Sequence, residues 1–137
     1  MELIKKFPET IIKGKEKPTQ HCLFKVREES QEKPLPQEKA EYYHTVVAKI
    51  LFLCKIGRPD TPTATEFITT RVHKPDQDEW NKLKRVMECL KQSKDLELTL
   101  SADKLNVMKW HIDAIQAVHP DMKGQKGVVI TLGKGFI

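Results

Sequence analysis

The sequence lacks an apolar run long enough to cross a membrane. A membrane-spanning helix needs roughly 18 or more consecutive apolar residues, whereas the longest apolar stretch, residues 46–54, is interrupted by Lys49. Residues 1–8 also lack the apolar segment of a secretory signal peptide. We therefore expect an intracellular protein with no membrane partner, in a compartment that the sequence leaves open.

Motifs for nucleotide binding and nucleophilic catalysis are missing as well. The chain contains no Gly-x-x-x-x-Gly-Lys-Ser/Thr phosphate loop, and its glycines are too scattered for a dinucleotide fingerprint. It contains no Gly-x-Ser-x-Gly nucleophile turn. The three cysteines, Cys22, Cys54 and Cys89, form no Cys-x-x-Cys pair. We therefore expect three reduced thiols in an intracellular protein.

The positive charge is mild and spread along the chain. The formal net charge is +5, with +2 over residues 1–36, +2 over 37–95 and +1 over 96–137. A dedicated DNA-binding domain usually concentrates its charge on one stripe. The charge balance therefore allows contact with nucleic acid without requiring it.

The first two thirds of the chain divide into a proline-rich segment and a helical segment. Prolines interrupt residues 1–36, which we expect to be extended or poorly ordered apart from one strand over 22–27. Residues 37–95 form the helical segment. Apolar residues at helical spacing predict helices over 37–56, 60–73 and 77–93. The last of these begins with Asp76 and, three residues later, Glu79, which is typical of a capping box.

The helix over 77–93 combines an apolar stripe with cationic side chains. The stripe predicts the buried face and consists of Trp80, Leu83, Val86, Met87 and Leu90. The cationic residues at its other positions are Lys82, Lys84, Arg85 and Lys91. Such charges usually form a solvated face, and contact with nucleic-acid phosphates is the sharper alternative.

After residue 95 the apolar period changes from 3.6 to 2, which predicts strands. The alternating stretches are 96–100, 105–113 and 128–132, and a turn over 121–127 is expected to join the last two. Residues 96–137 are therefore expected to form a small mixed or antiparallel sheet. A sheet of two or three strands leaves an unpaired edge.

Asp113 is the candidate catalytic residue because it ends a predicted strand. A carboxylate there is what two-metal phosphoryl-transfer sites use, although such sites need several carboxylates. His111 lies two residues earlier and shares its face of the strand. His119 and Asp121 repeat the spacing, so these four residues could ligate a transition metal, although such a pattern usually reflects ordinary loop polarity.

Four stretches of the chain, residues 44–60, 82–91, 95–100 and 107–114, form a collinear series that resembles copia-type LTR retrotransposon polyproteins. Residues 44–60 resemble that family's segment ending in Arg-Pro-Asp, and residues 82–91 resemble its basic Leu-Lys-Arg-Val helix. Residues 95–100 follow in the same order. Residues 107–114 then resemble the strand that opens the family's ribonuclease H domain. The resemblance covers residues 40–137, and it depends on the order of the stretches.

The resemblance implies the end of a reverse transcriptase, in its thumb or connection region, and the start of ribonuclease H. The family's polymerase carboxylates lie in a Tyr-x-Asp-Asp motif, which this chain lacks. Asp113 matches the first ribonuclease H carboxylate, a Mg²⁺ ligand in the intact parent enzyme, and the others are expected beyond Ile137. One Asp cannot organise two metal ions. We therefore expect no activity and no cofactor for the isolated chain.

Taken together, these patterns predict an α+β fold in which a small helical segment precedes a partial, truncated ribonuclease H-like β-sheet. The predicted function is that of a fragment of a copia-type reverse transcriptase/ribonuclease H polyprotein, with an RNA–DNA hybrid as a weakly bound partner. Two alternatives stay open: a non-catalytic nucleic-acid-binding module, and a captured interaction protein that self-associates through an open sheet edge.

Overall fold

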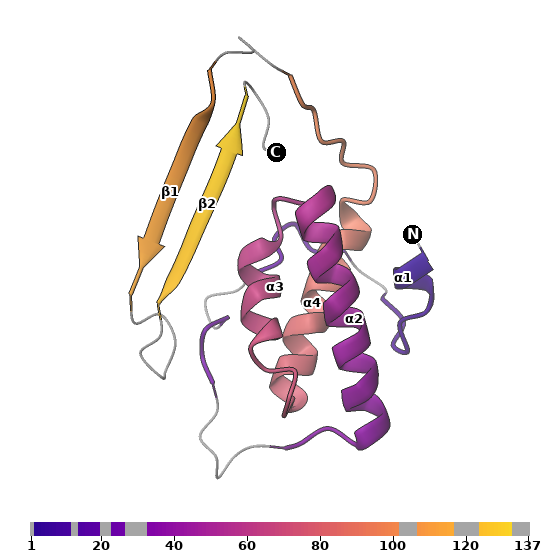
Figure 1. Cartoon of the computed structure of the whole chain (residues 1–137). Coiled ribbons are helices and arrows are strands. Elements are labelled where there is room, and N and C mark those ends of the chain that lie inside the picture. Colours follow the sequence, from indigo (N-terminus) through magenta and orange to yellow (C-terminus); the bar gives the residue numbers. More distant parts are fainter. Residues whose placement is uncertain are drawn as a thin grey trace. The chain divides into compact units, whose positions relative to one another are not determined.

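The computed structural model describes residues 2–11, 14–19, 23–26, 33–101, 107–116 and 124–132. Figure 1 shows the elements within these ranges, which are α1 (Glu2–Lys5), α2 (Gln37–Ile56), α3 (Pro62–Thr69), α4 (Gln77–Gln92), β1 (Lys109–Ile115) and β2 (Gln125–Thr131). Helices with a small antiparallel sheet are compatible with the predicted α+β class. None of the helices in these ranges is both long and apolar enough to span a membrane.

The chain consists of two units, which are described separately below. The helical unit is formed by Met1–Leu23 and Arg27–Leu96. The hairpin unit is formed by Phe24–Val26 and Glu97–Ile137. The helical unit thus contains most of the proline-rich N-terminal segment, together with the helices that follow it.

Helix α2 has the predicted bounds. Pro36 lies at its N-terminal boundary, where a missing N–H costs no helical hydrogen bond. At the other end the Gly57 N–H donates to the Leu53 carbonyl at 3.0 Å and closes the last turn. The buried residues recur every three or four positions, as expected for one face of a helix: Tyr43, Val46, Val47, Ile50 and Cys54.

Helix α3 is shorter than the predicted 60–73. It begins at Pro62 and ends at Thr69. Beyond this point the backbone tightens, because the N–H groups of Arg71 and Val72 donate to carbonyls three residues earlier, at 3.2 and 3.4 Å. The Thr70 hydroxyl also donates to the Phe67 carbonyl at 2.7 Å. Threonine hydroxyls that bond to the backbone compete with regular helix geometry, which the apolar spacing alone does not reveal.

Helix α4 begins with the predicted capping box. The Asp76 carboxylate accepts hydrogen bonds from the N–H groups of Asp78 and Glu79, at 2.6 and 3.0 Å. The Glu79 carboxylate accepts one in return from the Asp76 N–H at 3.3 Å. All five residues of the predicted apolar stripe, from Trp80 to Leu90, are buried. The prediction of this helix and its buried face is therefore confirmed.

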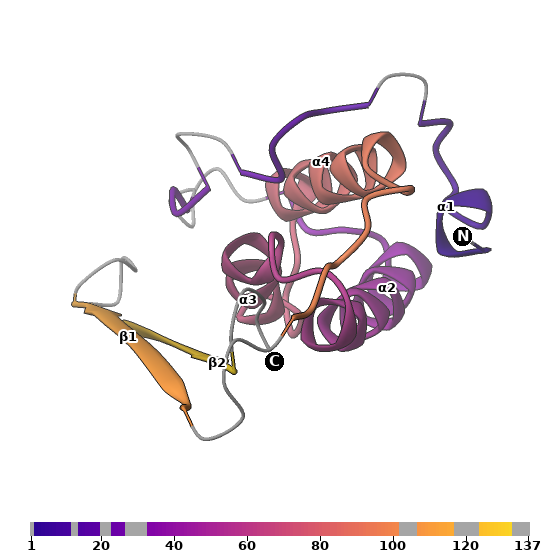
Figure 2. The same ribbon diagram turned by 90° about the horizontal axis from the view of Figure 1, so that it is seen from above.

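The core of the helical unit lies between α2, α3 and α4 (Figure 2). Its largest fully buried side chains are Trp80, Tyr43 and Phe67. The Tyr43 hydroxyl donates to the Ile68 carbonyl at 3.0 Å, which satisfies the one polar atom of this buried ring. Burial raises the pKa of Tyr43 far above its usual range.

The N-terminal segment packs onto the helices at several described positions. Phe7 is buried, and its ring stacks on Trp80 with 5.3 Å between the ring centroids. Ile11 and Leu23 are buried as well. The Tyr42 hydroxyl donates to the Lys6 carbonyl at 2.6 Å. These contacts add apolar surface to a three-helix core that is small by itself.

The hairpin unit contains the predicted pairing of two strands. β1 and β2 are antiparallel, and the paired positions run from Lys109 with Thr131 to Ile115 with Gln125. Asp113 lies opposite Gly127, inside β1 and not at its end. The strands begin and end a few residues from the predicted bounds.

Two other strand predictions are wrong. Residues 96–100 form no strand, and Leu96, Leu98 and Leu100 are exposed. Leu23 and Phe24 lie in a turn, whereas Cys22 and Arg27 of the same predicted strand lie outside the described residues. Alternation of apolar and polar residues is compatible with a strand, but only a paired neighbour stabilises one. Within the described residues, neither stretch has such a neighbour.

We expect Asp76→Ala to lower the free energy of unfolding by about 1–2 kcal/mol, because two helix N–H groups lose their acceptor. Asp76→Asn keeps an oxygen acceptor and should retain most of the stability. Chemical denaturation followed by helical circular dichroism measures both. Asp95→Ala is the matched control, since that side chain is 87% exposed. An Asp76→Ala effect as small as the control's would contradict the structural role of the cap.

Candidate nucleic-acid interface and carboxylate site

The four cationic residues predicted on α4 have two kinds of partner. Lys82 pairs with carboxylates: its ammonium lies 2.9 Å from Asp78 and 3.5 Å from Glu79. It also lies 4.9 Å from the centroid of the Phe67 ring, and its side chain is only 9% exposed. A phosphate group would have to displace these carboxylates to reach Lys82.

Lys84 also pairs with a carboxylate. Its ammonium donates to Glu9 at 2.7 Å, and the other Glu9 oxygen accepts from the Trp80 indole N–H at 2.6 Å. Lys39 lies 3.5 Å from the same carboxylate. The hydrogen bond from Lys84 is the main cause that lowers the pKa of Glu9, and the same bond raises the pKa of Lys84. The charge of Lys84 is therefore compensated within the fold.

Arg85 and Lys91 instead contact neutral carbonyl groups. The Arg85 Nε donates to the Thr19 carbonyl at 3.2 Å, and the Lys91 ammonium donates to the Ile11 carbonyl. A carbonyl orients a cation without cancelling its charge. Lys91 is exposed and Arg85 is half-buried, so both charges remain available to an anion in solvent.

Residues 14–19 run beside α4 and add cations that the helix pattern does not include. The Lys15 N–H donates to the Glu88 carbonyl at 3.4 Å, and the Cys89 thiol lies 3.8 Å from the Glu16 carbonyl. Lys15 and Lys17 are exposed. This segment therefore places two further cations along α4. No motif marks them, because only packing brings residues 14–19 to the helix.

Asp113 and His111 share the polar face of β1. Asp113 is exposed, and a Cβ added at Gly127 opposite would meet nothing within 4 Å, so that face of the strand pair is open. Within the described residues, no three His, Cys, Asp or Glu side chains gather to hold a metal. His119 and Asp121 lie outside those residues. The described residues therefore do not fit a Mg²⁺ pair, which needs several carboxylates.

Arg58 and Asp60, the ends of the Arg-Pro-Asp stretch, form a structural contact. Two guanidinium nitrogens donate to the Asp60 carboxylate, at 2.8 and 2.6 Å. The guanidinium also donates to the carbonyl of Ser93 at 3.3 Å and to its hydroxyl at 2.6 Å. The bonds between Arg58 and Asp60 raise the pKa of Arg58 and lower the pKa of Asp60. Together these contacts tie the turn between α2 and α3 to the end of α4.

Glu79 is a buried carboxyl group that the sequence pattern identifies only as a cap. It is 4% exposed. Burial is the largest cause that raises its pKa to about 7, and its contact with the neighbouring Asp76 carboxyl group adds to the effect. Lys82 opposes the shift. Glu79 therefore titrates near neutral pH inside the capping box.

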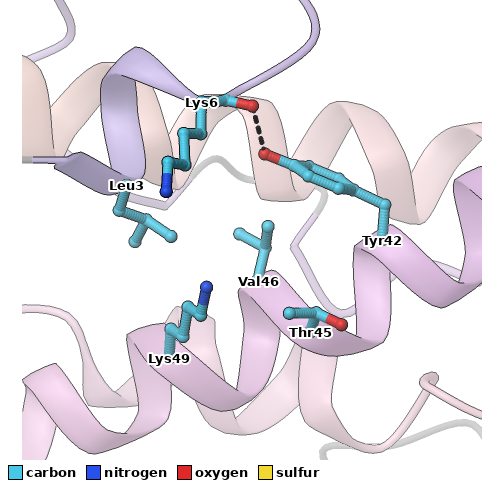
Figure 3. A pocket seen from close by; sticks show the side chains of 6 residues that line it. All are labelled: Leu3, Lys6, Tyr42, Thr45, Val46 and Lys49. Atoms are coloured by element: carbon cyan, nitrogen blue, oxygen red, sulfur yellow. Dashed lines mark hydrogen bonds between the residues drawn. The ribbon is translucent and has the colours of Figure 1, made fainter.

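A surface pocket of about 250 Å³ lies between α1 and α2 (Figure 3). It is lined by Leu3, Lys6, Tyr42, Thr45, Val46 and Lys49. The two lysines approach it from opposite sides. The pocket is thus apolar at Leu3 and Val46 and cationic at its sides. Among the described residues, its lining contains no carboxylate and no pair of groups arranged for acid–base catalysis.

A comparison of the chain with protein families, with curated proteins and with solved structures gives no match.

We expect the contribution of Glu79 to stability to fall as pH rises. Its folded pKa lies above the ordinary value of 4.5, so the folded state holds the proton more tightly. The contribution is complete below about pH 4.5 and is lost as pH rises through about 7. Glu79→Gln stays neutral, so its free energy of unfolding should increase relative to the unchanged chain between pH 5 and pH 8.

Urea denaturation at both pH values measures the difference in the free energy of unfolding between Glu79→Gln and the unchanged chain. The contributions of titratable groups that both chains share cancel in this difference. Glu41→Gln, the same change at an exposed position on α2, is the control. A difference that is independent of pH would contradict the assignment of the raised pKa to Glu79.

Proposed function

We propose that the chain is a non-catalytic segment of a copia-type reverse transcriptase/ribonuclease H polyprotein, and that its helical unit contacts the phosphates of a nucleic-acid duplex. The observation that supports this contact is the packing of residues 14–19 beside α4. It adds the exposed Lys15 and Lys17 to Arg85 and Lys91, which donate to carbonyl groups of the described residues. The order of helices followed by a strand pair with Asp113 on β1 agrees with the resemblance, in which a partial ribonuclease H-like sheet follows the helices.

The four cations of α4 form two groups, according to whether a carboxylate compensates their charge. Lys82 and Lys84 pair with carboxylates, and transfer to a phosphate would leave Asp78, Glu79 or Glu9 without that partner. Arg85 and Lys91 would leave only carbonyl oxygens. We therefore assign phosphate contact to Arg85, Lys91 and residues 14–19. Such binding is independent of base sequence and falls steeply with salt, because it releases condensed counterions.

We expect the combined change of Lys15, Lys17, Arg85 and Lys91 to alanine to weaken binding to an RNA–DNA hybrid. The slope of log affinity against log salt should decrease by about one for each phosphate group that the variant no longer neutralises. Fluorescence anisotropy with a labelled hybrid, at several salt concentrations, measures both quantities.

The control variant carries Lys49→Ala and Lys55→Ala, which remove exposed charges from α2. Compared with a matched variant that carries Arg85→Ala and Lys91→Ala, it removes the same total charge from another surface. Equal decreases in affinity for these two variants would show that net charge alone is responsible. Affinity of the unchanged chain that is independent of salt would refute phosphate contact altogether.

We expect no cleavage of an RNA–DNA hybrid by the purified chain in the presence of Mg²⁺ or Mn²⁺. Asp113 is one carboxylate, and a two-metal site requires several. Gel analysis of a labelled RNA strand measures cleavage, with Asp113→Asn as the matched variant. Metal-dependent cleavage that disappears in Asp113→Asn would reject the non-catalytic proposal.

A second candidate function is that of an interaction protein, and the hairpin unit favours it. Trp110, Ile112 and Val128 are 58%, 72% and 56% exposed. Large apolar side chains clustered at a surface are typical of binding surfaces.

A further inference from the structure

The outer edge of β1 has a charge pattern that is complementary to itself. Lys109, His111 and Asp113 alternate with apolar residues and share one face of the strand, since side chains alternate between faces. A cation and a carboxylate thus lie at equal distances on either side of His111. On β2, the positions opposite them are Thr131, Val129 and Gly127, which carry no charge.

We propose that β1 pairs antiparallel with β1 of a second copy of this chain, about a twofold axis at His111, to form a four-stranded sheet. Lys109 of each copy then lies opposite Asp113 of the other. On the apolar face, Trp110 of each copy lies opposite Ile112 of the other. Pairs of opposite charge and pairs of an aromatic with a β-branched residue both stabilise adjacent antiparallel strands.

A further strand at the edge of β1 would stabilise the sheet. Within the described residues, β2 is the strand that pairs with β1, and the sheet has two strands. A two-stranded sheet is marginally stable in water, and an open edge offers its unpaired N–H and C=O groups to another strand. If β2 instead paired antiparallel with β2 of a second copy, a twofold axis at Val128 would place Lys126 opposite Ile130. Such a pair would bring no opposite charges together. The charge pattern therefore favours β1.

The polar and apolar faces of β1 determine the register of the proposed pair. A shift by one residue would place the apolar face of one copy beside the polar face of the other. A shift of the axis to Ile112 would place His111 opposite Asp113 and leave Lys109 opposite Ile115. The axis at His111 pairs the charged residues of one copy with those of the other, and it pairs the large apolar side chains in the same way. It also predicts that His111 of one copy faces His111 of the other.

Analytical ultracentrifugation of the full chain tests the pairing. We expect the unchanged chain to form a dimer. Lys109→Asp and Asp113→Lys should each be monomeric, because each places like charges opposite one another. An equimolar mixture of the two should form a heterodimer, since the two carboxylates on β1 of one variant then face the two ammonium groups on β1 of the other. The double variant with both changes should again form a homodimer.

Two further variants test the edge and the register. Lys126→Asp, an exposed change on β2, should leave the dimer intact. His111→Lys should dissociate it, whereas His111→Gln should not. A dimer that persists in both Lys109→Asp and Asp113→Lys would overturn the proposal, as would a mixture that stays monomeric. An unchanged chain that remains monomeric up to millimolar concentration would overturn it as well.

Discussion

The indole of Trp80 lies where α4, α2 and the N-terminal segment meet. Its ring stacks on Phe7 and lies 6.3 Å from the Tyr42 ring, and the Lys39 ammonium lies 4.1 Å above it. Its N–H donates to Glu9. A fully buried tryptophan requires an acceptor for that N–H, because an unpaired buried donor is costly. Glu9 therefore joins residues far apart in sequence, and it holds Lys84 in the same contact. Together with the stacking of Phe7 on Trp80, these contacts of Glu9 hold the N-terminal segment on the helices.

The distribution of carboxylates decides which cations of the helical unit remain available to a ligand. Glu9, Asp78 and Glu79 compensate the charges on one part of α4, and Asp60 compensates Arg58. Arg85 and Lys91 are held by carbonyl groups of the N-terminal segment, which orient them and leave their charge intact. Two lysines on the same helix can therefore have different roles although the sequence pattern treats them alike. The proposed phosphate contact depends on this difference between ionic and neutral partners.

The hairpin unit presents a different physical problem. Its two strands pair in a defined register, yet Trp110, Ile112 and Val128 remain exposed and β1 pairs with one neighbour among the described residues. Backbone groups at a sheet edge and apolar side chains on its face both favour further association. Pairing with a second copy uses the edge, and the alternation of charges on β1 selects the register. Asp113 then has a role that does not require a metal, because it faces Lys109 of the other copy.

The sequence by itself determined the elements whose signals are local. Helical spacing predicted α2, the same spacing with the Asp76–Glu79 pair predicted α4 and its buried face, and alternation predicted the pairing of β1 with β2. Local signals failed where a partner decides the outcome: residues 96–100 alternate like a strand but have no neighbouring strand among the described residues. Only the tertiary structure decided which of the four cations on α4 pair with carboxylates and which with carbonyl groups, and that Lys15 and Lys17 lie beside them. The reason is that ion pairs and burial depend on residues such as Glu9 and Thr19, which lie about 70 positions away in the chain and which no period or motif connects to the helix.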